Sequence, residues 1–273
     1  MQIRTAEEAN RHPEYKDALV WLLYQLADDD FILAYRGSEW LGLAPHIEED
    51  VAFSSISQNM MGHAAMYYQL LEQLGEGTAD QLAHGRPAEE RRNAILLELP
   101  NGPGHYLKDA AYDWAFTVVR QFSYDQAKKI RLASLVNSSY QPLAEAARKI
   151  AMEQHYHILH WKTWFTQLIA SGGEATVRMQ DAVHKVWDDF AGVLDYGPAG
   201  GSIESFNLLE PSEALKSRWM SEMNKIFSSV GQPFPGELKM IRGNGRAGEH
   251  SVHLEEALST LSEVYEIDPA LSW

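Results

Sequence analysis

The 273-residue chain contains no cysteine. This absence excludes disulfides, thiolate catalysis and every zinc or iron–sulfur site that needs a cysteine ligand. Any metal would therefore have to be held by histidine and carboxylate side chains, of which the chain has 11 and 38.

Long apolar runs are also missing. No segment reaches the roughly 18 consecutive apolar residues that a membrane span requires. The first residues, Met1 to Glu8, lack the apolar core of a signal peptide. We therefore expect a cytoplasmic protein that makes no contact with a membrane.

Basic residues are few. Lysine and arginine together number 23 against 38 acidic residues, which gives a formal net charge of -15. The basic residues form no stripe, so the chain lacks the positive surface that the phosphates of a nucleic acid require. The acidity is more typical of solubility than of a basic partner, and we expect no nucleic-acid partner.

Strand patterns are lacking as well, because apolar residues recur at helical spacing through most of the chain. The pattern predicts an all-α protein. The expected long helices cover residues 13–40, 47–74, 104–137 and 141–171, with a polar crossover at 75–103 that contains one short helix at 89–93. Further helices are expected at 176–193, 211–228 and 250–265.

Short loops join the first two long helices into one antiparallel hairpin and the last two into another. A long crossover between two such hairpins is typical of ferritin-like four-helix bundles. We therefore predict a ferritin-like bundle over about residues 13–171, with additional helices of 172–273 packed on it. Because nothing after residue 172 is composed like a flexible linker, we expect a single domain over residues 1–273.

One predicted helix carries a candidate metal-binding pair. Glu153 and His157 are four residues apart, so they lie on the same helix face. Ferritin-like di-iron proteins use a Glu-x-x-His unit, but the residue three after Glu153 is Tyr156, a poor ligand for such a site. Asp125 and Glu153 are equally distant from the loop near Ser139, which places them level in the second hairpin.

The first hairpin offers a weaker half of such a site. His63 is level with Asp28 or Asp29 across the first loop. Met60 stands where the expected carboxylate would be, and Asn59 is four residues before the histidine. The candidates are thus two histidines and three carboxylates, whereas ferritin-like di-iron sites use four carboxylates and two histidines.

Three interpretations of these residues remain open. The favoured one is a remnant site without metal, in which the polar groups satisfy one another through hydrogen bonds and ion pairs. The alternatives are a single weakly bound metal and a working di-iron centre. The remnant comprises Asp28, Asp29, His63, Asp125, Glu153 and His157.

Two further patterns are less specific. Although His155, His157 and His160 are close in sequence, they lie on different helix faces and are not expected to form a metal cluster. The glycine-rich segment 243–248 follows no strand and lacks the Gly-Lys-Ser/Thr of a phosphate loop. With Arg242, Arg246 and Lys239 it remains a candidate for binding an anion or a partner.

Several dispersed motifs resemble those of one known family. They are Gly37 to Pro45, Leu99 to Gly102, Arg120 to Phe122 with Asp125, Glu153 to His157, and Gly245 to Leu254. From about residue 14 to Trp273, the chain is similar to the C-type subunits of bacterial phenylacetyl-CoA epoxidases.

That resemblance implies a ferritin-like, non-catalytic subunit that pairs with a related, catalytic A-type subunit. It also implies a di-iron centre in the A-type subunit, a small B-type subunit, and a reductase with FAD and an iron–sulfur cluster, so that this chain itself holds no cofactor. The whole system would convert phenylacetyl-CoA, O2 and NADPH to the ring 1,2-epoxide in aerobic phenylacetate catabolism.

Two competing hypotheses come from other classes of protein. The first is an independent di-iron oxidase or oxygenase that uses Asp28 or Asp29 together with His63, Asp125, Glu153 and His157. The second is a ferritin-like storage protein. It fits less well, because the chain has a long C-terminal extension and too few carboxylates at the candidate site.

Overall fold

The computed structural model describes residues 2–270. Regular structure in this range is helical apart from one isolated bridge between Ile3 and Tyr140, so the predicted all-α class is confirmed. None of the described helices is both long and apolar enough to cross a membrane. The four long helices are α2 (Pro13–Ser38), α3 (Ile47–Gln73), α6 (Trp114–Leu135) and α7 (Gln141–Ala170).

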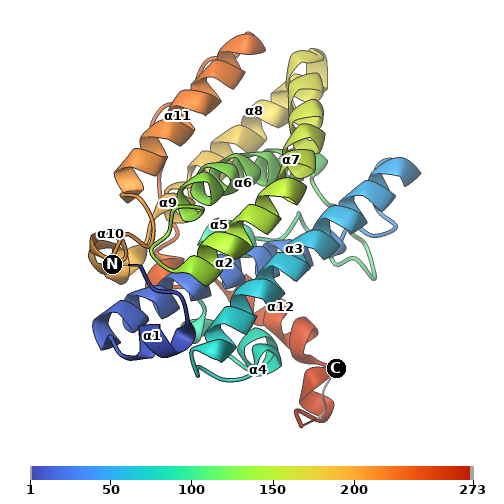
Figure 1. The fold of residues 1–273 in the computed structure, drawn as a ribbon. Coiled ribbons are helices and arrows are strands. Elements are labelled where there is room, and N and C mark those ends of the chain that lie inside the picture. Colours follow the sequence, from blue (N-terminus) through green and yellow to red (C-terminus); the bar gives the residue numbers. More distant parts are fainter. Residues whose placement is uncertain (1, 271–273) are drawn as a thin grey trace.

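The long helices form the two predicted hairpins, because α2 packs along α3 and α6 packs along α7. α3 also contacts α7, which joins the hairpins into one bundle (Figure 1). This arrangement, with its long crossover between α3 and α6, is consistent with a ferritin-like bundle.

Shorter helices surround this bundle. α8 and α11 pack beside α6, whereas α12 packs against α2, α4 and α5 (Figure 1). These elements are α1 (Ala6–Asn10), α4 (Ala79–His84), α5 (Ile95–Glu98), α8 (Gly173–Trp187), α9 (Ala191–Leu194), α10 (Gly200–Ser205), α11 (Ser212–Ser229) and α12 (Val252–Ser262).

The second half of α2 is the centre of the molecule. Every residue from Gln25 to Gly37 is buried, because α3, α5, α6 and α12 cover different sides of the helix. A helix buried on all sides normally presents apolar residues in every direction. This one carries three consecutive aspartates, and their partners determine how the surrounding segments are held.

The predicted start of the third long helix, at Gly104, is wrong, because α6 begins at Trp114. The carboxylate of Asp113 accepts a hydrogen bond from the backbone N–H of Phe116, which is a typical N-cap. The preceding residues form a loop instead. It is closed by the backbone N–H of Asp113, which donates to the carbonyl of Asn101 at 2.8 Å, and Gly104 adopts a positive φ of 86° that a helix would not allow.

The crossover differs from its prediction in a similar way. The single helix expected at 89–93 is only a short 3-10 turn, Ala88–Glu90, and the crossover contains α4 and α5, which the sequence pattern did not indicate. The turn ends where Arg91 adopts an extended backbone and its side chain becomes fully buried. The burial of the Arg91 guanidinium thus outweighs the local sequence pattern, which would have continued the helix.

Two of the three C-terminal helices are shorter than predicted, whereas α11 matches the helix expected at 211–228. The helix expected at 176–193 ends as α8 at Trp187, and the one expected at 250–265 is α12. After α8 the backbone pairs with a distant segment: the N–H of Lys239 donates to the carbonyl of Trp187, and the N–H of Ala191 donates to the carbonyl of Lys239. This long-range pairing replaces the continuation of the helix.

Gly37 provides a test of how closely α2 and α3 approach each other. A Cβ atom added at Gly37 would lie 2.3 Å from Ser57 Oγ and 2.9 Å from Phe53 Cε2. We therefore expect Gly37→Ala to lower the free energy of unfolding by about 1–3 kcal/mol, measured by urea denaturation.

Gly62→Ala is the matched control, since Gly62 also lies in a long helix but its added Cβ would meet nothing within 4 Å. It should stabilise the protein by about 0.5–1 kcal/mol. Equal effects of the two substitutions would contradict the close packing of α2 on α3.

Candidate functional site

The site is built around Asp28, Asp29 and Asp30 of α2, which are fully buried. Successive residues of an α-helix project about 100° apart, because one turn holds 3.6 residues. The three carboxylates therefore point in three directions, and each meets a different part of the chain.

Asp28 faces the crossover. Its Oδ1 atom accepts from Arg86, Arg91 and the hydroxyl of Tyr68, and Oδ2 accepts from the backbone N–H of Arg92 at 2.8 Å. Burial alone would raise the pKa of Asp28, but the guanidinium groups of Arg86 and Arg91 outweigh burial and hold the pKa below its ordinary value. The carboxylate of Asp28 is therefore charged, and it holds the crossover against α2.

Asp29 faces the C-terminal region. Both of its oxygens accept from the guanidinium of Arg246, each at 2.8 Å, in a bidentate pair. Arg131 of α6 donates to Oδ2 at 3.2 Å, and the backbone N–H of Ala94 donates to Oδ1 at 3.0 Å. Arg246 belongs to the glycine-rich segment 243–248, a candidate for anion binding, and the anion that it binds is Asp29 of the same chain.

Asp30, which the sequence pattern did not single out, faces α6. The ammonium of Lys128 donates to both oxygens of Asp30, at 2.8 and 2.7 Å, and the hydroxyl of Tyr124 donates to Oδ1 at 2.8 Å. The same ammonium lies 2.9 Å from Nδ1 of His63. Lys128 thus places a positive charge between a carboxylate and an imidazole.

His63 connects this buried cation to the surface. Because an ammonium only donates hydrogen bonds, Nδ1 of His63 accepts from Lys128, and the network assigns the ring proton to Nε2, which donates to Glu153 at 2.8 Å. Burial, together with the charge of Lys128, lowers the pKa of His63 far below its ordinary value. The imidazole is therefore neutral, while the Glu153 side chain is 52% exposed.

His157 lies beside this pair. Its ring centroid is 6.0 Å from that of His63, and its Nε2 atom is 3.3 Å from the amide nitrogen of Asn59. Burial lowers the pKa of His157 to about 3, and Lys128 adds to the effect. Glu153 and His157 thus face α3 together, in keeping with their spacing of four residues.

Asp125 makes no side-chain hydrogen bond to these groups. It is fully buried, and neither carboxylate oxygen has a hydrogen-bond partner among the described residues. Its backbone carbonyl is 3.5 Å from the amide nitrogen of Gln154, the residue after Glu153, so the predicted levels of the two helices agree with the structure. Burial raises the pKa of Asp125 to about 7.

The structure therefore separates the six predicted residues. His63, Glu153 and His157 lie together, whereas Asp28 and Asp29 turn away toward arginines. Within residues 2–270, no three histidine, aspartate or glutamate side chains gather in a way that could hold a metal ion.

The other two histidines of α7 point elsewhere, as expected from their positions. His160 contacts Glu49 of α3, with 2.7 Å between Nε2 and Oε1, and His155 lies over the groove between α6 and α7.

Sequence reasoning singled out Arg246 as a candidate for binding an anion, but it missed the other basic partners and the pairing of Arg246 with Asp29. The signals available were the run Asp28-Asp29-Asp30 inside an apolar stretch and Lys128 inside a largely buried helix. Three adjacent carboxylates in a buried helix require cations nearby, but the sequence does not say which ones. Arg246, for example, is 217 residues away from Asp29.

Comparison with known proteins places these observations in context. The family described as phenylacetic acid catabolic protein matches residues 1–273. The C subunit of the 1,2-phenylacetyl-CoA epoxidase of Escherichia coli (strain K12) is 26% identical over 250 residues, which cover 91% of this chain and 96% of that protein. The A subunit of the same enzyme is 24% identical over 207 residues, which cover 71% of this chain and 61% of that protein.

The role of Lys128 can be tested by removing its charge. Lys128→Met leaves the buried carboxylate of Asp30 without its cation, and breaking a buried ion pair in this way costs about 3–5 kcal/mol. We expect a loss of this size in the free energy of unfolding, measured by urea denaturation. Lys129→Met is the matched control, because the adjacent Lys129 is exposed, and its effect should stay within about 0.5 kcal/mol.

Removing both members of the Asp30–Lys128 pair provides a second test. The double variant Asp30→Leu with Lys128→Met should recover much of the lost stability, since no unpaired charge remains. A single Lys128→Met variant as stable as the wild type would show that the Asp30–Lys128 pair does not hold the core together.

The raised pKa of Asp125 predicts that the free energy of unfolding depends on pH. Its folded-state pKa of about 7 exceeds the unfolded value of about 3.9, so the folded protein binds the proton more tightly. The contribution of Asp125 to stability therefore falls as pH rises from about 4 to about 7, and stays low above that range. Asp125→Asn, which does not ionise, should gain stability relative to the wild type over this interval by up to about 4 kcal/mol.

The measurement is urea denaturation of both proteins at several pH values between 4 and 8. A difference between Asp125→Asn and the wild type that stays constant across this range would contradict the raised pKa.

Proposed function

Because the chain belongs to the phenylacetic acid catabolic protein family, we propose that it is the non-catalytic, stabilising subunit of a phenylacetyl-CoA 1,2-epoxidase. Its partner in this proposal is a catalytic A-type subunit that holds the di-iron centre. The complex also has a B-type subunit, together with a reductase that holds FAD and iron–sulfur, and it works in the cytoplasm in phenylacetate catabolism.

The observation that carries the proposal is the position of Lys128. Its ammonium donates to Asp30 and contacts the Nδ1 lone pair of His63. A carboxylate and an imidazole lone pair are the groups that a divalent metal would need. In this chain a monovalent side-chain cation uses both of them.

The remaining donors do not fit a di-iron centre. Such centres in this fold need four carboxylates and two histidines. Asp28 and Asp29 bind arginines, so only Asp125 and the half-exposed Glu153 remain of the predicted carboxylates. Glu153 is the one that contacts His63 within the described residues. Removing the arginines to free the carboxylates would also leave buried charges unpaired.

The extent of the similarity supports the assignment to the C type. The match to the E. coli C subunit extends over nearly the whole of both proteins, whereas the match to the A subunit leaves more than a third of that protein uncovered. The weaker likeness to the A subunit indicates a shared ancestry of the two subunit types. Related helical bundles can pair through equivalent faces as pseudo-symmetric heterodimers.

The proposal predicts the composition of the purified protein. The chain expressed alone in iron-replete medium should contain much less than one iron per monomer and should not turn over phenylacetyl-CoA. When co-expressed with the A-type subunit of the same organism, it should co-elute with that subunit in size-exclusion chromatography with light scattering.

The A-type subunit purified in the same way is the control for iron loading. Two tightly bound irons per chain in elemental analysis would instead support the independent di-iron oxygenase. Separate elution of the two proteins at micromolar concentration would also contradict the proposal.

A further inference from the structure

The outward face of α7 carries exposed apolar side chains in a row. Met152 is 68% exposed, Tyr156 is 71% exposed and Leu159 is 58% exposed. Residues at positions i, i+4 and i+7 lie on one face of a helix, so these three form a continuous stripe. Single exposed apolar residues are common on protein surfaces, whereas a row of large ones on one helix marks a contact site.

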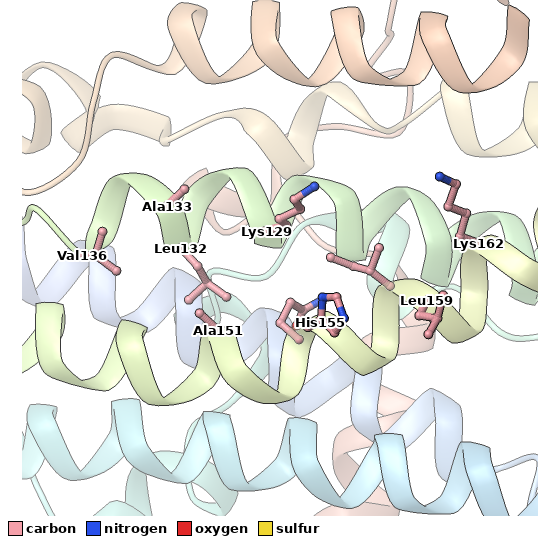
Figure 2. A pocket seen from close by; sticks show the side chains of 10 residues that line it. Lys129, Leu132, Ala133, Val136, Ala151, His155, Leu159 and Lys162 are labelled. Carbon is pink, nitrogen blue, oxygen red and sulfur yellow. The ribbon is translucent and has the colours of Figure 1, made fainter. Parts of the chain in front are cut away.

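The stripe borders a groove between α6 and α7. Leu132, Ala133 and Val136 form one wall, and Ala151, Ile158 and Leu159 form the other. Figure 2 shows the labelled side chains of both helices facing this space, which has a volume of about 380 Å³. Because Leu159 belongs both to the stripe and to the groove, the two features make one apolar surface, which we call the α6–α7 groove.

Positive charge borders this surface. Lys129 and Lys162 lie at the groove and extend to the same side in Figure 2. The exposed basic residues on α6 and α7 are Lys129, Arg148, Lys149 and Lys162, against two exposed acidic ones, Glu145 and Glu153. One of these acids already accepts a hydrogen bond from His63. Of these charged residues, only Lys129 and Lys162 line the groove itself, and no aspartate or glutamate lines it, in a chain whose net charge is -15.

A ligand for this surface needs an apolar ridge flanked by negative charge. A third helix laid between two packed helices places its own side-chain ridge in the groove between them. An amphipathic helix with apolar residues at positions i, i+3, i+4 and i+7 can pack that ridge into the apolar groove. Acidic residues beside the ridge complement the charge of the two lysines.

We propose that the α6–α7 groove is the docking surface for an acidic amphipathic helix of the A-type subunit. This inference rests on the proposed function, because the partner in both is the A-type subunit. The apolar ridge of that helix would cover Leu159 and Tyr156, and its acidic flank would face Lys129 and Lys162. Docking would also cover Glu153, which lies on the neighbouring face of α7 and is half exposed.

The test measures the affinity of the full-length chain for the A-type subunit by titration calorimetry. Leu159→Glu places an acidic charge in the groove, and Lys162→Glu reverses a charge at its border. We expect Leu159→Glu to weaken binding at least about 10-fold, as truncation of central contact residues does. Lys162→Glu should weaken it to a similar extent, because it replaces an attractive charge at the border with a repulsive one. Higher salt should weaken wild-type binding more than binding by Lys162→Glu.

Val252→Glu is the matched control. Val252 is also 58% exposed, but it lies at the start of α12 on a different part of the molecule. This variant should bind the A-type subunit within about 2-fold of the wild type. Circular dichroism must show that all variants keep the helical content of the wild type.

The outcomes separate the two proposals. If the wild type binds the A-type subunit and both groove variants bind equally well, the groove is not the docking surface, although the proposed function stands. If the wild type does not bind that subunit, both proposals fail. Dimerisation of the chain alone that Leu159→Glu abolishes, or binding of phenylacetyl-CoA that requires Lys129 and Lys162, would assign the groove to another occupant and overturn the inference.

Discussion

The structure depends on the burial of three consecutive carboxylates in the central helix α2. A buried carboxylate without a partner is so costly that each one must be met by a cation and by hydrogen-bond donors. Because Asp28, Asp29 and Asp30 project in different directions, their cations come from different segments: the crossover, the C-terminal region and α6. These ion pairs therefore fix segments that have little regular structure of their own.

The same pairing determines what the site can do chemically. Arg86, Arg246 and Lys128 satisfy the aspartates of α2 with side-chain cations, and the pairs are completed by backbone N–H groups and tyrosine hydroxyls. In a di-iron protein of this fold, the buried carboxylates coordinate metal ions instead. A bundle that is stabilised by its own basic residues no longer needs a metal to neutralise its core. This arrangement supports the proposal that the chain keeps the fold and acts through a partner.

Local patterns predicted much of the architecture. The long helices, both hairpins and the shared face of Glu153 and His157 follow from apolar spacing and helix geometry. The start of α6 was placed ten residues too early, because the pattern continued past the N-cap at Asp113. The role of Lys128 and the partner of Arg246 escaped prediction for a different reason. Their roles arise from contacts 98 and 217 residues away along the chain, which no local pattern contains.

The central claim is that the polar cluster maintains structure and takes no part in the chemistry. The most direct test is phenylacetyl-CoA turnover by the complete reconstituted complex that contains the double variant His63→Gln with Glu153→Gln. Glutamine can still accept from Lys128 at position 63. We predict turnover per A-type subunit within about 2-fold of the wild-type complex. Loss of a catalytic acid or base typically costs about 100-fold or more, and a loss of that size in a folded, fully assembled complex would contradict this account.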